Sequence, residues 1–121
     1  MAKEFKIPIK CKKEDRYYNI VEILRMIYPL NKLRPRERQV YAALMEYYHK
    51  YSSLGEKERN RLIFDFETRS EIAEKIGVSK DVIYNIMKDL KKKGVIGKSS
   101  MKKDYIVSKY NKITFEFIDQ D

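Results

Sequence analysis

The chain has 121 residues, 43% of them hydrophobic, which is enough for one domain with one modest core and argues against an unfolded tail. Its one cysteine, Cys11, excludes an internal disulfide, and its one histidine, His49, has no second soft ligand nearby, which excludes structural zinc. The formal net charge is +9, no apolar run is long enough to span a membrane, and residues 1–13 lack the apolar stretch of a signal peptide, so we expect a basic cytoplasmic protein without a membrane partner.

The first 32 residues are expected to form an N-terminal extension made of a strand and a helix. Residues 5–9, FKIPI, alternate apolar and polar side chains, which predicts a short strand, and Pro8 would confine it to a sheet edge. Residues 16–28 carry apolar side chains at helical spacing and predict a helix that ends at Pro29. This helix either covers the core of the next domain or pairs with its copy in a second subunit. Residues 1–32 are therefore a candidate dimerisation element.

The next helix is predicted over residues 33–51, because Pro35 suits a first helical turn and apolar residues recur on one side. Its last part holds three tyrosines, Tyr47, Tyr48 and Tyr51. These rings can stack on the bases of a single strand, but their helical spacing favours packing in the core or between subunits. Residues 52–60 are polar and predict a loop or a short charged turn, and residues 62–66, LIFDF, predict a short strand.

Residues 68–90, TRSEIAEKIGVSKDVIYNIMKDL, contain two amphipathic helices joined by a very short turn. Thr68 and Glu71 have the spacing of a capping box and predict the start of the first helix. Gly77 ends that helix, because the turn needs a left-handed backbone that glycine adopts without steric cost. Ser79 is the expected N-cap of the second helix.

The second of these helices has two distinct faces. Its apolar stripe consists of Val82, Ile83, Ile86, Met87 and Leu90. The opposite face, which a partner would meet, carries Lys80, Asp81, Tyr84, Asn85 and Lys88. Small Ala73 allows the two helices to cross closely, Gly77 makes the turn, and Ile83 fills the core six residues later. This spacing resembles the DNA-binding helix-turn-helix pattern, with an ordinary helical hairpin as the alternative.

A hairpin is predicted after the second helix. Residues 91–96, KKKGVI, close the helix with cations, which suit its negative end, and then start a strand. We expect residues 95–96 in the first strand, a polar, basic tip over residues 99–104, and residues 105–107 in the return strand. Residues 113–117 alternate apolar and polar side chains and predict a further strand. The segment from the lysine run onward resembles the wing of a winged helix-turn-helix protein.

Residues 33–118 as a whole therefore resemble the winged helix-turn-helix superfamily of DNA-binding proteins, in the form found in bacteria, phages and plasmids. The resemblance implies a mainly α fold with a small antiparallel β-sheet (α+β), in a domain that follows the extension of residues 1–32. It also implies that the second helix of the pair enters the major groove of double-stranded DNA, while the basic wing contacts the backbone or the minor groove. Winged regulators of this kind usually bind as homodimers on two half-sites.

The basic charge is concentrated where this resemblance expects the DNA. Residues 79–112 carry ten lysines against three aspartates and so contribute +7, although lysine runs are often only solvated surface. The candidate DNA-binding residues are Arg69, Ser79, Lys80, Asp81, Tyr84, Asn85, Lys88, Lys92, Lys98, Lys102 and Lys103. Asn85 can pair with adenine, and Lys80 and Lys88 with guanine or phosphate. Asp81 departs from a purely basic face, since an acid there either accepts from cytosine or repels phosphate.

No catalytic, cofactor or metal site is expected, because Cys11 and His49 lack an activating context and the glycines form no phosphate-binding loop. We expect a non-enzymatic transcriptional regulator that binds double-stranded DNA as a homodimer. One alternative is a replication-origin binding or accessory protein, with a polymerase or replication factor as its protein partner. Another is a winged protein-interaction module without specific DNA binding.

Overall fold

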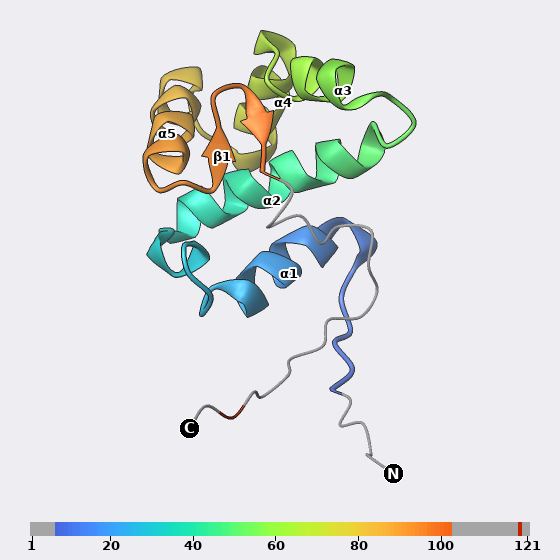
Figure 1. Ribbon diagram of the computed structural model, residues 1–121, viewed down its shortest axis with the longest axis vertical. Helices are drawn as coiled ribbons and strands as arrows, with labels where there is room; N and C mark the ends of the chain where they lie inside the picture. Colours follow the sequence, from blue (N-terminus) through green and yellow to red (C-terminus); the bar gives the residue numbers. More distant parts are fainter. Residues whose placement is uncertain (1–6, 103–118, 120–121) are drawn as a thin grey trace.

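The computed structural model describes residues 7–102 and residue 119 of the chain. Within that part, five helices pack around one core and a short antiparallel hairpin follows them (Figure 1). The fold is therefore mainly α with a small antiparallel sheet, which confirms the α+β class expected from the sequence. Among the described residues, no helix combines the length and the apolar character needed to cross a membrane.

The elements follow one another with short connections. The helices are α1 (Arg16–Leu24), α2 (Pro35–Lys50), α3 (Glu56–Ile63), α4 (Phe66–Ile76) and α5 (Lys80–Lys92). Two 3-10 helices flank α1, namely η1 (Lys13–Asp15) and η2 (Leu30–Lys32). The hairpin consists of β1 (Ile96–Gly97) and β2 (Ser100–Met101), in which Ile96 lies opposite Met101 and Gly97 opposite Ser100.

The central element is α2, which the other four helices all contact (Figure 1). Its Val40, Tyr41, Leu44 and Met45 are completely buried. Each large apolar side chain removed from water in this way contributes about 1.5 to 3 kcal/mol of transfer free energy. Because α4 and α5 both pack on α2, this helix determines where the following helix pair stands.

The helix α1 packs against α2 and belongs to the same core. Its Ile20, Val21 and Leu24 are buried together with residues of α2, α4 and α5. The carboxylate of Glu22 binds the Arg38 Nε of α2 at 2.7 Å, which ties the two helices together at their edge. Of the two roles expected for this helix, the structure therefore shows that it covers the core of the chain that follows.

Two expectations for the N-terminal region are wrong. The helix ends at Leu24 rather than near residue 28, because a helix continued to Pro29 would drive the proline ring into the carbonyl of Arg25. The strand expected over residues 5–9 is absent from its described part, where Ile7 and Ile9 are exposed and pair with no other strand. Phe5 lies outside the described residues.

Residues 52–55 form a turn, as expected, but the helix α3 (Glu56–Ile63) corrects the rest of the loop expected over residues 52–60 and the strand expected over residues 62–66. In the helix α3, the guanidinium of Arg59 lies 3.6 Å from the ring centroid of Tyr48, and its Nε donates to the Tyr48 carbonyl at 2.8 Å. This bond satisfies a carbonyl in the last turn of α2 that has no partner within the helix. Ile63 is completely buried, while Phe66 is 57% exposed. The apparent alternation of LIFDF thus spans the end of one helix and the start of the next.

Candidate nucleic-acid interface

The turn between α4 and α5 has the geometry expected from the sequence. Gly77 adopts φ +83°, and the amides of Gly77 and Val78 both donate to the Ala73 carbonyl at 2.9 Å. Ser79 is the N-cap of α5, since its Oγ accepts from the Val82 amide at 3.3 Å. Three residues therefore suffice to reverse the chain between the two helices.

The start of α4 is not where the sequence suggested. Asp65 is the N-cap, and its carboxylate accepts from the Phe66 amide at 2.7 Å. Thr68 lies inside the helix and is buried, and its hydroxyl donates to the Leu62 carbonyl at 2.7 Å. The expected capping box with Glu71 is therefore wrong, because Thr68 joins α4 to the end of α3 instead.

Two bonds hold α4 on α2. The hydroxyl of Tyr47 donates to the Glu71 carboxylate at 2.5 Å, and burial together with this carboxylate raises the pKa of the Tyr47 phenol. Lys75 Nζ lies 2.8 Å from the Glu46 carboxylate. Tyr48 is buried in the core. These contacts agree with packing, the role that the sequence favoured for the tyrosines of α2, rather than with stacking on bases.

The helix α5 is anchored on one side and open on the other. Ile83, Ile86, Met87 and Leu90 are buried in the core. Val82 was expected with them but is 39% exposed, because it lies about 100° around the helix from Ile83, at the margin of the buried stripe. The opposite side carries five exposed residues, as expected, namely Lys80, Asp81, Tyr84, Asn85 and Lys88.

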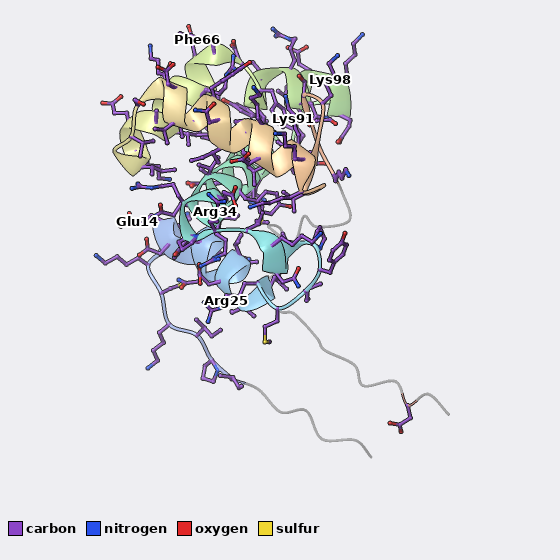
Figure 2. All side chains as sticks on the ribbon, turned by 90° about the vertical axis from the view of Figure 1, so that its left-hand side faces the viewer. Glu14, Arg25, Arg34, Phe66, Lys91 and Lys98 are labelled. Atoms are coloured by element: carbon purple, nitrogen blue, oxygen red, sulfur yellow. The ribbon has the colours of Figure 1, made fainter. Side chains whose placement is uncertain are left out.

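An aromatic residue that the sequence analysis missed lies beside this open face. Phe66, the first residue of α4, has Lys80 Nζ at 4.7 Å from its ring centroid. In the same way, Lys88 Nζ lies 5.4 Å from the ring centroid of Tyr84. Figure 2 looks onto the molecule from the side of α5, with Phe66 near the start of the helix and Lys98 near its end. Phe66 was missed because residues 62–66 were predicted to be a strand. Recognition of Asp65 as an N-cap would have placed Phe66 in the first turn of α4.

The hairpin after α5 is much smaller than expected. The return strand is Ser100–Met101, so the connection is only Lys98 and Ser99, and Ser99 has φ +58°. The Met101 amide donates to the Asn60 side chain at 3.0 Å, which fixes β2 against α3. The tip expected over residues 99–104 is therefore wrong. The return strand expected at residues 105–107 and the strand at residues 113–117 lie outside the described residues.

The remaining candidate residues divide into three groups. Lys92, Lys98 and Lys102 are exposed, at the end of α5 and on the hairpin. Lys103 lies outside the described residues. Arg69 is half-buried on α4, where it contributes to a pocket of about 80 Å³ between α4, α5 and the hairpin connection. We call this the Arg69 pocket, and its lining includes Lys91 and Ser99, which the sequence analysis did not select.

A larger pocket elsewhere has the opposite charge. It has a volume of about 280 Å³ and lies where η1 and α1 meet α2 and α4. Its lining includes the carboxylates of Glu14, Asp15 and Glu46, against the single cation of Lys75. Burial raises the pKa of the Tyr17 phenol in its wall. An acidic surface repels phosphates, so the α5 side is the better candidate for contact with nucleic acid.

Within the described part of the chain, no three His, Cys, Asp or Glu side chains come together as a metal site. Cys11 is exposed. Comparison of the whole chain with protein-family models, curated proteins and solved structures gives no match.

Proposed function

We propose that α4 and α5 form a DNA-binding helix-turn-helix, that β1 and β2 are its wing, and that the protein is a site-specific double-stranded DNA-binding protein that regulates transcription. Support comes from the three-residue turn, from an α5 helix that is buried on one face and polar on the other, and from the hairpin that directly follows α5. In this proposal the turn joins the two helices of the helix-turn-helix and the hairpin follows its second helix as the wing.

One observation carries the proposal, namely that the cations of this surface have no neutralising partners. Among the described residues, no ion pair involves Lys80, Lys88, Lys91, Lys92 or Lys98. By contrast, Lys75 is paired with Glu46 and Lys93 with Glu37, so acidic partners are supplied where lysines support the fold. A surface that keeps its positive charge uncompensated attracts a polyanion such as the DNA backbone.

In this proposal α5 enters the major groove, which is wide enough for a helix and presents distinguishable base edges. Asn85 hydrogen-bonds to an adenine, and Lys80 and Lys88 contact guanine or phosphate. Ser79 and the free amides of the first turn of α5 suit a phosphate at the helix N-terminus. Lys98 and Lys102 contact the backbone beside the groove.

The test is selection of preferred duplexes from a random pool at near-physiological salt, followed by affinity measurements on selected and scrambled duplexes. We expect a recovered motif, and if about six phosphates are neutralised, the logarithm of affinity falls with that of salt at a slope of about −5. Half-sites about one helical turn apart would indicate a dimer. Recovery of no motif, with weak binding that vanishes as salt rises, would contradict the proposal.

The matched variants separate readout from general attraction. Asn85→Ala is expected to lose about 1 to 3 kcal/mol of binding free energy for the selected duplex and to relax specificity at one base position. Lys12→Ala removes one positive charge from an exposed position before α1 and serves as the control. If Asn85→Ala and Lys12→Ala bind the selected duplex equally well, Asn85 is not a reading residue.

A further inference from the structure

The Arg69 pocket joins three elements that are distant in the sequence. Arg69 comes from α4, Lys88 and Lys91 come from α5, and Ser99 comes from the connection between β1 and β2. Because each element has its own anchor in the core, the pocket depends on the tertiary fold. It lies on the flank of α5, beside the exposed face that carries Asn85.

The charge of the pocket is one-sided. Three of its lining residues, Arg69, Lys88 and Lys91, are cationic, and no aspartate or glutamate lines it. Neither Lys88 nor Lys91 forms an ion pair with any residue in the described part of the chain. The hydroxyl groups of Tyr84 and Ser99 add hydrogen-bond donors. The lining therefore offers positive charge and donors to an anion.

Arg69 provides a second and independent observation. Its Nε is buried, and it has no hydrogen-bond partner among the described residues. A buried guanidinium N–H without an acceptor is unfavourable, since water can no longer satisfy it. Arg69 lines the pocket, so an oxygen bound there is a candidate acceptor for this N–H. Arginine presents its N–H groups as a fork that fits two oxygens of one phosphate.

The size of the pocket limits the ligand. Its volume of about 80 Å³ is well below the roughly 300 Å³ at which pockets for drug-sized ligands begin, so a nucleotide does not fit. A single tetrahedral oxyanion is of the right scale. Phe64 and Met87 supply an apolar part of the wall, and an apolar wall strengthens the attraction between a bound anion and the cations.

We propose that the Arg69 pocket binds one phosphate group, held by the guanidinium of Arg69 and by the ammonium groups of Lys88 and Lys91. If this phosphate belongs to the DNA backbone, the inference rests on the proposed function. Free inorganic phosphate presents the same anionic group to the pocket. A backbone phosphate in this pocket carries no base information. It fixes how far α5 reaches into the groove and in which register, and thus positions Asn85.

The first experiment uses inorganic phosphate alone. The ¹⁵N-labelled full chain is titrated with phosphate against sodium chloride of equal ionic strength, and the Arg69 Nε–Hε and Ser99 amide signals are followed by NMR. In the parent chain we expect a saturable shift of both signals. In Arg69→Gln, which has no Nε–Hε group, the shift of the Ser99 amide should be lost. In Lys91→Gln the shift of both signals should be weaker. Lys57→Gln, at an exposed position of α3 outside the pocket, is the control and should titrate as the parent chain does.

The second experiment uses the selected duplex with single phosphates replaced in turn by uncharged methylphosphonate. Replacement of one particular phosphate per half-site is expected to lower the affinity of the parent chain about tenfold. The same replacement should leave the affinity of Arg69→Gln unchanged. Thermal unfolding checks that Arg69→Gln is folded. If it is not, Lys91→Gln, whose side chain is exposed, takes its place.

The outcomes separate the inference from the proposed function. A saturable phosphate shift in a chain that recovers no DNA motif would support the pocket as a free-phosphate site and overturn the proposed function. DNA binding with no phosphate shift, and with Arg69→Gln and Lys91→Gln equal to the parent chain at every substituted phosphate, would overturn the inference and leave the proposed function standing.

Discussion

Lys93 Nζ, just beyond the end of α5, lies 2.5 Å from Oε1 of Glu37 in the first turn of α2. The Glu37 side chain is 3% exposed, and the same Oε1 accepts from the Arg34 amide at 2.7 Å. One carboxylate thus caps α2 and holds the far end of α5. Because the hairpin directly follows Lys93, this ion pair also fixes the direction in which the chain leaves α5 toward β1.

Loss of the Glu37 charge is expected to destabilise the fold. Glu37→Gln leaves the Lys93 ammonium, only 23% exposed, without a counter-charge, and we expect a loss of about 1.5 to 3 kcal/mol in the free energy of unfolding. Urea unfolding measures the loss. Glu74→Gln, on the exposed side of α4, is the control and should change stability by less than about 0.5 kcal/mol. Equal stability of the two variants would contradict a structural role for the pair.

The Gly77 turn offers a test of backbone strain alone. A Cβ at Gly77 would meet nothing within 4 Å, yet its φ of +83° is strained for any L side chain. Gly77→Ala is therefore expected to lower the free energy of unfolding by about 1 to 2 kcal/mol through local backbone strain, without a clash with any other part of the described chain. Gly77→Asn should lose clearly less stability than Gly77→Ala, since asparagine tolerates the left-handed region. Thermal unfolding of both variants measures the difference. An alanine variant as stable as the parent chain would argue against this account.

The contact between α1 and α2 is expected to depend on pH. The hydrogen bond from Arg38 lowers the pKa of the Glu22 carboxyl from its ordinary value of 4.5. A lowered pKa in the folded state means that the contribution is present above pH 4.5 and is lost as pH falls through the folded pKa. In urea unfolding, Glu22→Gln should be less stable than the parent chain by up to about 1 kcal/mol at pH 7, and the gap should close toward pH 3. A gap that stays constant over this range would show that ionisation of Glu22 plays no part.

The Tyr47 hydroxyl is expected to stabilise the seat of α4 on α2. Tyr47→Phe removes the donor to Glu71 and should cost about 1 kcal/mol in chemical unfolding. The raised pKa of Tyr47 means that this contribution is present below the ordinary phenol pKa of 10 and is lost as pH rises above it. Tyr51→Phe is the matched control, because Tyr51, the C-cap residue of α2, stacks beside Tyr47. If both variants lose the same amount, the bond to Glu71 is not the cause.

The hairpin lysines are expected to contribute general attraction rather than specificity. The double variant Lys98→Ala, Lys102→Ala should bind selected and scrambled duplexes more weakly by the same factor. The slope of log affinity against log salt should become shallower by about 2. Lys12→Ala with Lys57→Ala removes the same charge from exposed positions outside the α5 face and the hairpin. A change in base preference in the hairpin variant would mean that the hairpin reads sequence.

Local chemistry allowed the sequence to determine the α4–α5 unit in detail. A left-handed turn needs glycine, so Gly77 identifies the turn, and a serine two residues later supplies the cap of α5. The buried stripe of α5 follows from the 3.6-residue period, which predicted all four buried residues and wrongly added only the marginal Val82. Every one of these features depends on residues within about two turns of one another.

Only the tertiary structure decided the features that depend on distant partners. The helix α3 has too few apolar residues to show a period, and its place depends on Arg59 reaching Tyr48 of α2. The sequence around Thr68 is typical of an N-cap, yet Thr68 lies inside α4, where its hydroxyl donates to the Leu62 carbonyl. The Arg69 pocket needs α4, α5 and the hairpin at once. The sequence by itself therefore determined what short stretches of backbone and their periodic faces require, while packing against α2 decided which polar side chains meet.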